Sequence, residues 1–282
     1  MAGWVFEDWR GGRFYPEGLK QKDELNWASR HVTAIEINAT FYSNQKAASF
    51  ANWAAQTPPG FMFAVKGHQV VTHIKRLKDV DVPLANFFAS GVLALGDRLG
   101  PICWQLPGNA AFDADRMKTF LALLPHTADE AVALAGRHDV RIAAPHLDAT
   151  GIGPVRHAIE VRHKSFADPA FIAMLREANV ALVTADTADW PYIDQTADFT
   201  YCRLQGAPGA EHYTPAGLDL WAGRLKSLST GKPLTDVPLI APPAKVQPAR
   251  DVFAFFVSTD KPNAPGNALG IQQRLGLTPA RA

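Results

Sequence analysis

The chain has 282 residues and a formal net charge of +1, with 28 lysines and arginines against 27 aspartates and glutamates. This balance argues against a dedicated duplex-binding protein, because such domains are usually strongly basic. Hydrophobic residues make up 47% of the chain and charged residues 20%, which is enough apolar material for the core of one large domain.

Neither a leader nor a membrane span is indicated by the sequence. The stretch Met1–Asp8 lacks the basic and then apolar pattern of a secretory signal, and no run of about 18 apolar residues could cross a bilayer. The two cysteines, Cys103 and Cys202, lie in apolar runs, so we expect buried thiols rather than a disulfide framework or a zinc site. The expected location is the cytoplasm, and no membrane partner is expected.

Short apolar runs predict seven strands, which lie near Ala34–Asn38, Met62–Lys66, Ile102–Leu106, Ala158–His163, Ala181–Asp186, Thr200–Gln205 and Val252–Ser258. Between them, apolar residues recur at helical spacing, as in stretches 117–124, 171–178 and 218–225. Asp168-Pro169 and Thr214-Pro215 each predict the start of a helix, because a capping side chain precedes a proline at the first helical position.

Two longer connections interrupt this alternation, at about 127–155 and, rich in proline, at about 231–250. We expect both to be surface insertions, because the alternation resumes after each. The chain is therefore predicted to be a single domain over residues 1–282.

Strands that alternate with helices predict a parallel sheet covered by helices, which is either open and doubly wound or closed into a (β/α)8 barrel of the TIM type. The sequence has neither Gly-x-Gly-x-x-Gly after an early strand nor a Walker-type motif. The common signatures of the open class are therefore missing, and no cofactor is indicated.

The faces of the strands decide between these two architectures. In the first strand, Ile35 and Ile37 share one face while Glu36 and Asn38 share the other, and in the last strand Ser258 gives a polar end to the face of Ala254 and Phe256. A barrel needs an apolar outer face and tolerates polar groups inside its C-terminal mouth, whereas an open sheet needs two apolar faces. We therefore predict a barrel whose mouth holds Glu36, Asn38, Lys66, Gln105, Glu160, Arg162, Asp186, Arg203 and Gln205.

A series of motifs runs through nearly the whole chain: Gly3-Trp4, Phe14-Tyr15-Pro16, Glu36-Ile37-Asn38-Ala39-Thr40-Phe41-Tyr42, Phe63-Ala64-Val65-Lys66, Thr72-His73, Gln105-Leu106-Pro107, Glu160-Val161-Arg162-His163 and Tyr201-Cys202-Arg203-Leu204. In this order they resemble the YecE-like family, also called domain of unknown function 72. The resemblance implies a TIM-type barrel. It supplies no reaction and no catalytic residues.

The chain departs from the family pattern at three places. The family usually has a strand just before the position of Gly3-Trp4, so the first strand is expected to be truncated or missing, which would expose an unpaired edge. Gln205-Gly206 stands where the family usually has His-Gly, and Phe256-Val257-Ser258 stands where it usually has Phe-Asp-Asn. These two changes remove an imidazole and a carboxylate, which argues against any mechanism that needs them.

The carboxylates of the predicted mouth, Glu36, Glu160 and Asp186, are the candidates for proton transfer. Glu160 and Asp186 would act as general acid and base if burial separated their pKa values. A glycosidase-like or metal-assisted hydrolase is an alternative, although no clustered histidine spacing indicates a metal site. The carboxylates could instead only neutralise the cations of the mouth as a buried network.

Anion recognition is the leading interpretation, because the guanidinium groups of Arg162 and Arg203 suit phosphate or carboxylate. Further ligand contacts are expected from Lys66, Asn38, His73, Gln105, Gln205 and Tyr42. We therefore predict an enzyme of undefined reaction that acts on a phosphorylated or otherwise anionic small molecule. The alternative is a non-catalytic module that binds a nucleic-acid strand through a basic rim with exposed aromatics.

Overall fold

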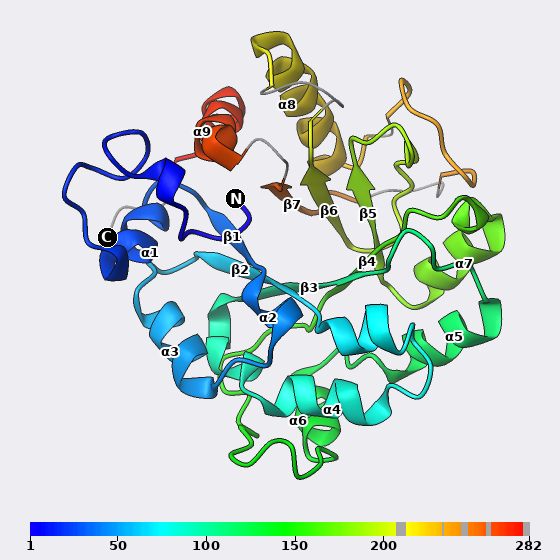
Figure 1. Cartoon of the computed structure of the whole chain (residues 1–282). Helices are drawn as coiled ribbons and strands as arrows, with labels where there is room; N and C mark the ends of the chain where they lie inside the picture. Colours follow the sequence, from blue (N-terminus) through cyan, green and yellow to red (C-terminus); the bar gives the residue numbers. More distant parts are fainter. Residues whose placement is uncertain (207–212, 233, 244–247, 258–260, 279–282) are drawn as a thin grey trace.

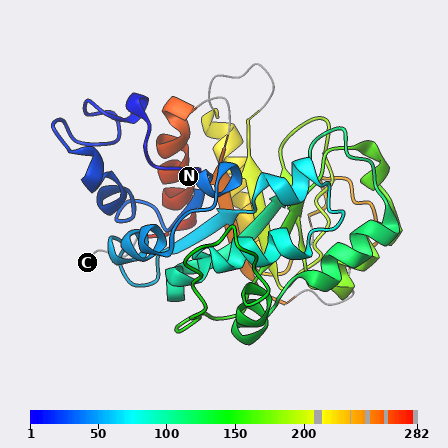
Figure 2. The same ribbon diagram turned by 60° about the horizontal axis from the view of Figure 1, so that its bottom comes forward.

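Seven parallel strands form the centre of the computed structural model, and helices surround them (Figures 1 and 2). The structure describes residues 1–206, 213–232, 234–243, 248–257 and 261–278. Neighbouring strands in the sheet are also neighbours in the chain: β1 (Ala34–Ile37), β2 (Met62–Lys66), β3 (Leu99–Gln105), β4 (His157–Glu160), β5 (Ala181–Ala185), β6 (Phe199–Leu204) and β7 (Asp251–Phe256). The seven predicted strands are confirmed, with ends that differ from the prediction by up to three residues.

The α-helices within the described residues are α1 (Glu24–Ala28), α2 (Ala39–Tyr42), α3 (Ala47–Ala55), α4 (Asp81–Ala89), α5 (Ala114–Leu123), α6 (Ala128–Ala135), α7 (Pro169–Glu177), α8 (Pro215–Ser229) and α9 (Ala264–Leu275). A π-helical turn, η3 (Val70–Ile74), follows β2. Both predicted helix starts are confirmed, because the Asp168 side chain accepts from the Ala170 amide and Thr214 from the Gly217 amide. These caps satisfy amides that have no partner within the helix.

The two long connections each contain ordered chain. The first holds α6, whose start is fixed by a capping box between Thr127 and Glu130. In the second, the amides of Ile240 and Ala241 donate to the carboxylate of Asp194 at 2.8 and 3.0 Å. Residues 233 and 244–247 of this predicted insertion lie outside the described residues.

Two apolar clusters divide the core according to the two faces of the sheet. The larger cluster lies between strands and helices and includes Ile35, Val65 and Trp104. The smaller one fills the barrel interior with Ala64, Cys103, Ala158, Ala181, Val183, Phe199, Tyr201 and Phe255. Side chains alternate along a strand, so the residue two positions beyond an interior side chain also points inward, nearer the mouth.

In β7 the two faces are exchanged relative to the prediction: the side chains expected to point into the barrel point outward. Phe255 of β7 belongs to the interior cluster, while Phe256 packs with the outer cluster. The expectation that Phe256 lies inside is therefore wrong, because both faces of this strand are apolar and their alternation carries little information. Ser258, on which that expectation depended, lies outside the described residues.

The N-terminal residues lie between β1 and β7, where a truncated or missing first strand was expected (Figure 1). Ala2 forms a parallel bridge with Glu36, the Gly3 amide donates to the Glu36 carbonyl at 2.8 Å, and the Ala2 amide donates to the Phe256 carbonyl at 3.3 Å. The barrel is thus closed near its mouth. The edge that was expected to be exposed is therefore covered there. Within the described residues, no helix is long and apolar enough to cross a membrane.

Candidate functional site

A buried ion network lies inside the barrel mouth, centred on Arg203 of β6. Its Nε and Nη2 donate to the two carboxylate oxygens of Glu36 at 2.9 and 3.1 Å, and its Nη1 donates to Glu160. The side chains of Arg203, Glu36 and Glu160 are 7%, 0% and 2% exposed. We call these three residues the inner ion network. The hydroxyl of Tyr201, two residues before Arg203 on the same face, also donates to Glu36.

A chain of hydrogen bonds extends this network toward the rim. Glu160 and Gln105 are cross-strand partners, and the Gln105 Nε2 donates to the Glu160 Oε1 at 2.9 Å. Because a carboxylate only accepts, the Gln105 amide oxygen is left to accept from the Lys66 Nζ, at 2.8 Å. Arg162, which follows β4, donates to the same Glu160 oxygen through Nε and Nη2 at 3.1 and 2.8 Å.

The electrostatics of the network keep both Glu160 and Arg203 charged. Burial by itself would raise the pKa of Glu160, but Arg203 and Arg162 together lower it to about 2. Burial would likewise lower the pKa of Arg203, but Glu36 and Glu160 raise it well above its ordinary value. The Glu160 carboxylate is therefore ionised at neutral pH.

The rim above this network carries an excess of positive charge. Arg162 is the more open of the two arginines, with a side chain 41% exposed. The pKa of His73, in η3, is lowered. The main cause is burial, and the positive charges of Lys66, Arg162 and Arg76 add to it, while Glu160 acts in the opposite direction. Three cations thus act on one imidazole, which is expected to be neutral at neutral pH.

A cavity of about 430 Å³ opens at this mouth, and its lining includes Asn38, Tyr42, Lys66 and Arg203 together with Lys261. Tyr42 is 70% exposed and Asn38 is half-buried, so both are open to a ligand. We call this space the mouth cavity. The structure thus brings together the predicted site residues Glu36, Asn38, Tyr42, Lys66, His73, Gln105, Glu160, Arg162 and Arg203 around one end of the barrel.

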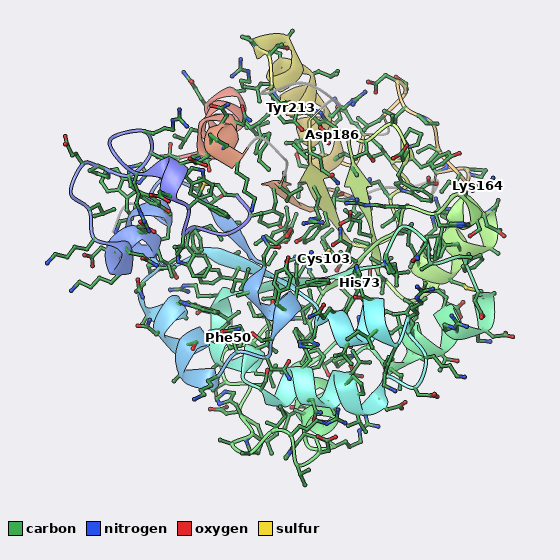
Figure 3. All side chains as sticks on the ribbon, in the orientation of Figure 1. Phe50, His73, Cys103, Lys164, Asp186 and Tyr213 are labelled. Carbon is green, nitrogen blue, oxygen red and sulfur yellow. The ribbon has the colours of Figure 1, made fainter. Side chains whose placement is uncertain are left out.

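Asp186 does not join the inner ion network. It follows β5 on the face of Leu182, which packs with the outer cluster, and its carboxylate accepts from the Gln205 and Gly206 amides at 2.6 and 3.1 Å and from the Tyr213 hydroxyl. Figure 3 shows Asp186 beside Tyr213, apart from Cys103 near the centre of the barrel. The expected place of Asp186 among the ionised groups of the mouth is therefore corrected: it holds the chain that follows β6.

Sequence reasoning missed several members of the site. Tyr201 could have been found, because it shares the face of Arg203. Phe41, whose ring centre lies 4.4 Å from the Lys66 Nζ, belongs to the family-like motif of residues 36–42. Arg76 and Lys261 had no signal in the strand pattern, since both lie in connections.

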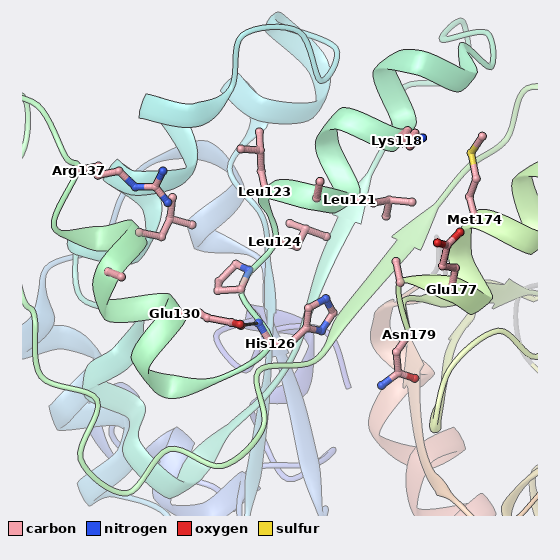
Figure 4. A pocket seen from close by; sticks show the side chains of 15 residues that line it. Lys118, Leu121, Leu123, Leu124, His126, Glu130, Arg137, Met174, Glu177 and Asn179 are labelled. Carbon is pink, nitrogen blue, oxygen red and sulfur yellow. Dashed lines mark hydrogen bonds between the residues drawn. The ribbon is translucent and has the colours of Figure 1, made fainter.

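A cavity larger than the mouth cavity lies elsewhere. It has a volume of about 940 Å³ and lies between α5, α6 and α7, beside the chain that enters β4 and β5 (Figure 4). Its lining is mixed, with Leu121 and Met174 near Lys118 and Glu177. Active sites of this architecture lie at the opposite, C-terminal end of the strands. Within the described residues, no three His, Cys, Asp or Glu side chains are grouped so that they could hold a metal ion.

Comparisons with known proteins agree with this fold. Over 76 residues the chain is 32% identical to the UPF0759 protein YunF of Bacillus subtilis strain 168, and the match spans 26% of that relative's length and 27% of this chain. A crystal structure of a DUF72 family protein from Thermotoga maritima MSB8 has a TM-score of 0.67 at 24% identity, covering 98% of this chain and 97% of the other.

A DUF72 family protein from Enterococcus faecalis V583 has a TM-score of 0.68 at 15% identity, covering 98% of this chain and 94% of the other. These structural similarities concern the fold alone. The family model described as "Protein of unknown function DUF72" matches residues 1–282. The chain therefore belongs to the DUF72 family.

Proposed function

We propose that the protein is an enzyme that binds a small phosphorylated or otherwise anionic molecule at the barrel mouth, between the mouth cavity and Arg162. The observation that carries this proposal is the charge balance around the cavity. Arg203 is enclosed by Glu36 and Glu160, whereas the half-exposed Arg162 contacts Glu160 alone. Lys66 is linked to Glu160 only through Gln105. With Asp186 engaged elsewhere, the described mouth carries more cations than carboxylates.

The donors left on these cations suit an anion. Arg162 uses Nε and Nη2 on Glu160, which leaves Nη1 free for another acceptor within the described residues. The ammonium group of Lys66 has three donors and gives one to Gln105. Charge-assisted hydrogen bonds of this kind are the stronger ones, and guanidinium groups match the geometry of phosphate.

The same geometry assigns different tasks to the candidate catalytic groups. Glu160 is held as an anion by Arg203 and Arg162, and Glu36 is enclosed with Arg203, so both would position the cations rather than exchange protons with a ligand. His73, near Lys66 and Arg162 and neutral at neutral pH, is better suited to proton transfer. A glycosidase-like pair would need one protonated carboxylic acid, and the ion pairs of Glu160 oppose this.

Isothermal titration with inorganic phosphate and a panel of sugar phosphates tests the proposal. Arg162→Gln is expected to weaken binding on the order of tenfold, because one charge-assisted contact is lost. Arg274→Gln is the matched control, since Arg274 pairs with Asp219 on α8 and has no hydrogen bond to Glu160, the carboxylate that Arg162 contacts. If no anion binds, or if both variants bind alike, the proposal is wrong.

A second function has one observation in its favour. The loop after η3 carries the exposed side chains of Lys75, Arg76 and Lys78, and Tyr42, which lines the mouth cavity, is exposed as well. A basic rim with an exposed aromatic fits a single nucleic-acid strand. Binding of an oligonucleotide whose affinity falls steeply with added salt would favour this function over a small ligand.

A further inference from the structure

Lys66 differs from the other described lysines in its burial. It ends β2 inside the barrel and is 8% exposed, whereas every other lysine in the described ranges is exposed. It nevertheless lines the mouth cavity. A lysine in such a place is shielded from bulk water but open to a bound ligand.

The contacts of Lys66 hold its amine without neutralising it. Its Nζ donates to the Gln105 amide oxygen at 2.8 Å and lies 4.4 Å from the centre of the Phe41 ring. Neither partner is a carboxylate, and the described residues give Lys66 no ion pair within 4.0 Å. The Gln105 amide is itself fixed by Glu160, so the position of the Nζ is set by the inner ion network.

Burial and the nearby Arg203 lower the pKa of Lys66, and the more distant influence of Glu36 and Glu160 does not restore it. More of this amine is neutral at a given pH than in a free lysine. Desolvation and a neighbouring cation are the two features that activate lysine as a nucleophile toward carbonyl groups.

We propose that Lys66 is a nucleophile whose Nζ forms a Schiff base with the carbonyl carbon of a small anionic aldehyde or ketone in the mouth cavity. This inference rests on the proposed function, because Arg162 and the rim cations would hold the anionic group while the carbonyl reaches Lys66. It narrows the substrate class from anions in general to phosphorylated carbonyl compounds.

The step balances without a further reagent. The lone pair of the neutral amine forms the C–N bond, and the carbonyl π electrons move to oxygen, which takes a proton to give a carbinolamine. The C–O bond then breaks, and the oxygen leaves as water with one hydrogen from the amine and one proton from solvent. The product is an iminium ion on Lys66 and one water molecule.

Borohydride trapping tests this chemistry, because borohydride delivers hydride to the iminium carbon and makes the link permanent. The full chain is incubated with dihydroxyacetone phosphate, and in parallel with dihydroxyacetone, before reduction. Intact mass and peptide mapping then locate any adduct, whose mass is that of the probe less one oxygen. The variants are Lys66→Arg, which retains the charge but not the amine, and Lys118→Arg, the same change at an exposed lysine of α5.

The expected result is one adduct per chain on Lys66, retained in Lys118→Arg, lost in Lys66→Arg and formed only with the phosphorylated probe. Labelling in the wild-type protein that is absent or spread over surface lysines overturns the inference, whether or not Lys66→Arg folds. Thermal shifts with dihydroxyacetone phosphate, without borohydride, separate the two proposals. Stabilisation without an adduct would support the anion site and contradict the Schiff base. An adduct on Lys66 that forms equally with dihydroxyacetone would contradict the anion site and support the nucleophilic role of Lys66.

Discussion

Arg203 and Arg162 lie in the same barrel mouth and share one carboxylate, yet their surroundings differ. The side chain of Arg203 is 7% exposed and is enclosed by Glu36 and Glu160. The side chain of Arg162 is 41% exposed and contacts Glu160 but not Glu36. A buried charge must be matched by its neighbours, because an unpaired ion in the interior is costly. A half-exposed charge is stabilised by water and can exchange that water for a ligand.

This comparison suggests that burial separates two tasks among charges that look alike in the sequence. The inner ion network holds the strands β1, β4 and β6 together across the barrel. The rim cations are left to recognise a ligand. Loss of an inner charge should therefore lower stability, whereas loss of a rim charge should lower ligand affinity.

The largest effect is expected from Arg203→Met. It leaves Glu36 and Glu160 buried without their shared cation, so the free energy of unfolding should fall by about 3–5 kcal/mol. Chemical denaturation measures this. Arg141→Met is the control, because the Arg141 side chain is 69% exposed in its pair with Asp139 and an exposed ion pair contributes little to stability. Equal losses in the two variants would contradict the proposed role of the inner ion network.

The pH dependence of Glu160→Gln should sharpen the same point. The pKa of Glu160 is lowered from 4.5 to about 2, so its contribution to stability is present above pH 4.5 and is lost as the pH falls toward 2. The wild-type protein should therefore be more stable than Glu160→Gln near neutral pH, and this difference should shrink in acid. Unfolding free energies measured across this range check it, and a difference independent of pH would show that Glu160 acts without its charge.

Periodicity predicted most of the inner ion network, for a physical reason. In β1, β4 and β6 one face is clearly apolar, so the opposite face, with Glu36, Glu160 and Arg203, had to point into the barrel. Parallel strands then bring these residues to one end. The sequence could not state which cation pairs with which carboxylate, because that depends on the register and tilt of strands distant in the chain.

The same reasoning failed where both faces of a strand are apolar. In β5, Leu182 and Val183 belong to different clusters although both are aliphatic, so alternation did not reveal that Asp186 follows the outer face. Strand periodicity also could not predict where residues in the connections lie, since no periodicity fixes the path of a loop. Arg76, whose charge acts on His73, and Lys261, which lines the mouth cavity, both lie in such connections.

A smaller effect is expected from Asp186→Asn. Its carboxylate accepts from the Gln205 and Gly206 amides and from Tyr213, and an asparagine can offer only one accepting oxygen. The free energy of unfolding should fall by about 1–3 kcal/mol, the usual cost of leaving such donors unpaired. The comparison variant is Tyr213→Phe, which removes one contact of Asp186 and the hydrogen bond that the Gly206 amide donates to the Tyr213 hydroxyl at 2.8 Å. Chemical denaturation should give the larger loss for Asp186→Asn, because it disturbs all three donors of the carboxylate. The reverse order would mean that Asp186 does not hold the chain after β6.

The smallest effect on stability is expected from Arg162→Gln. Glu160 keeps Arg203 and Gln105 as partners, so the free energy of unfolding should change by less than about 1 kcal/mol in a buffer free of phosphate. Phosphate should then separate the two proteins, because a ligand that binds only the folded state stabilises it more, the lower its Kd. The wild-type protein should gain more stability from added phosphate than Arg162→Gln does. If Arg162→Gln without ligand is instead destabilised as much as Arg203→Met, both arginines serve the fold, and burial does not divide their tasks.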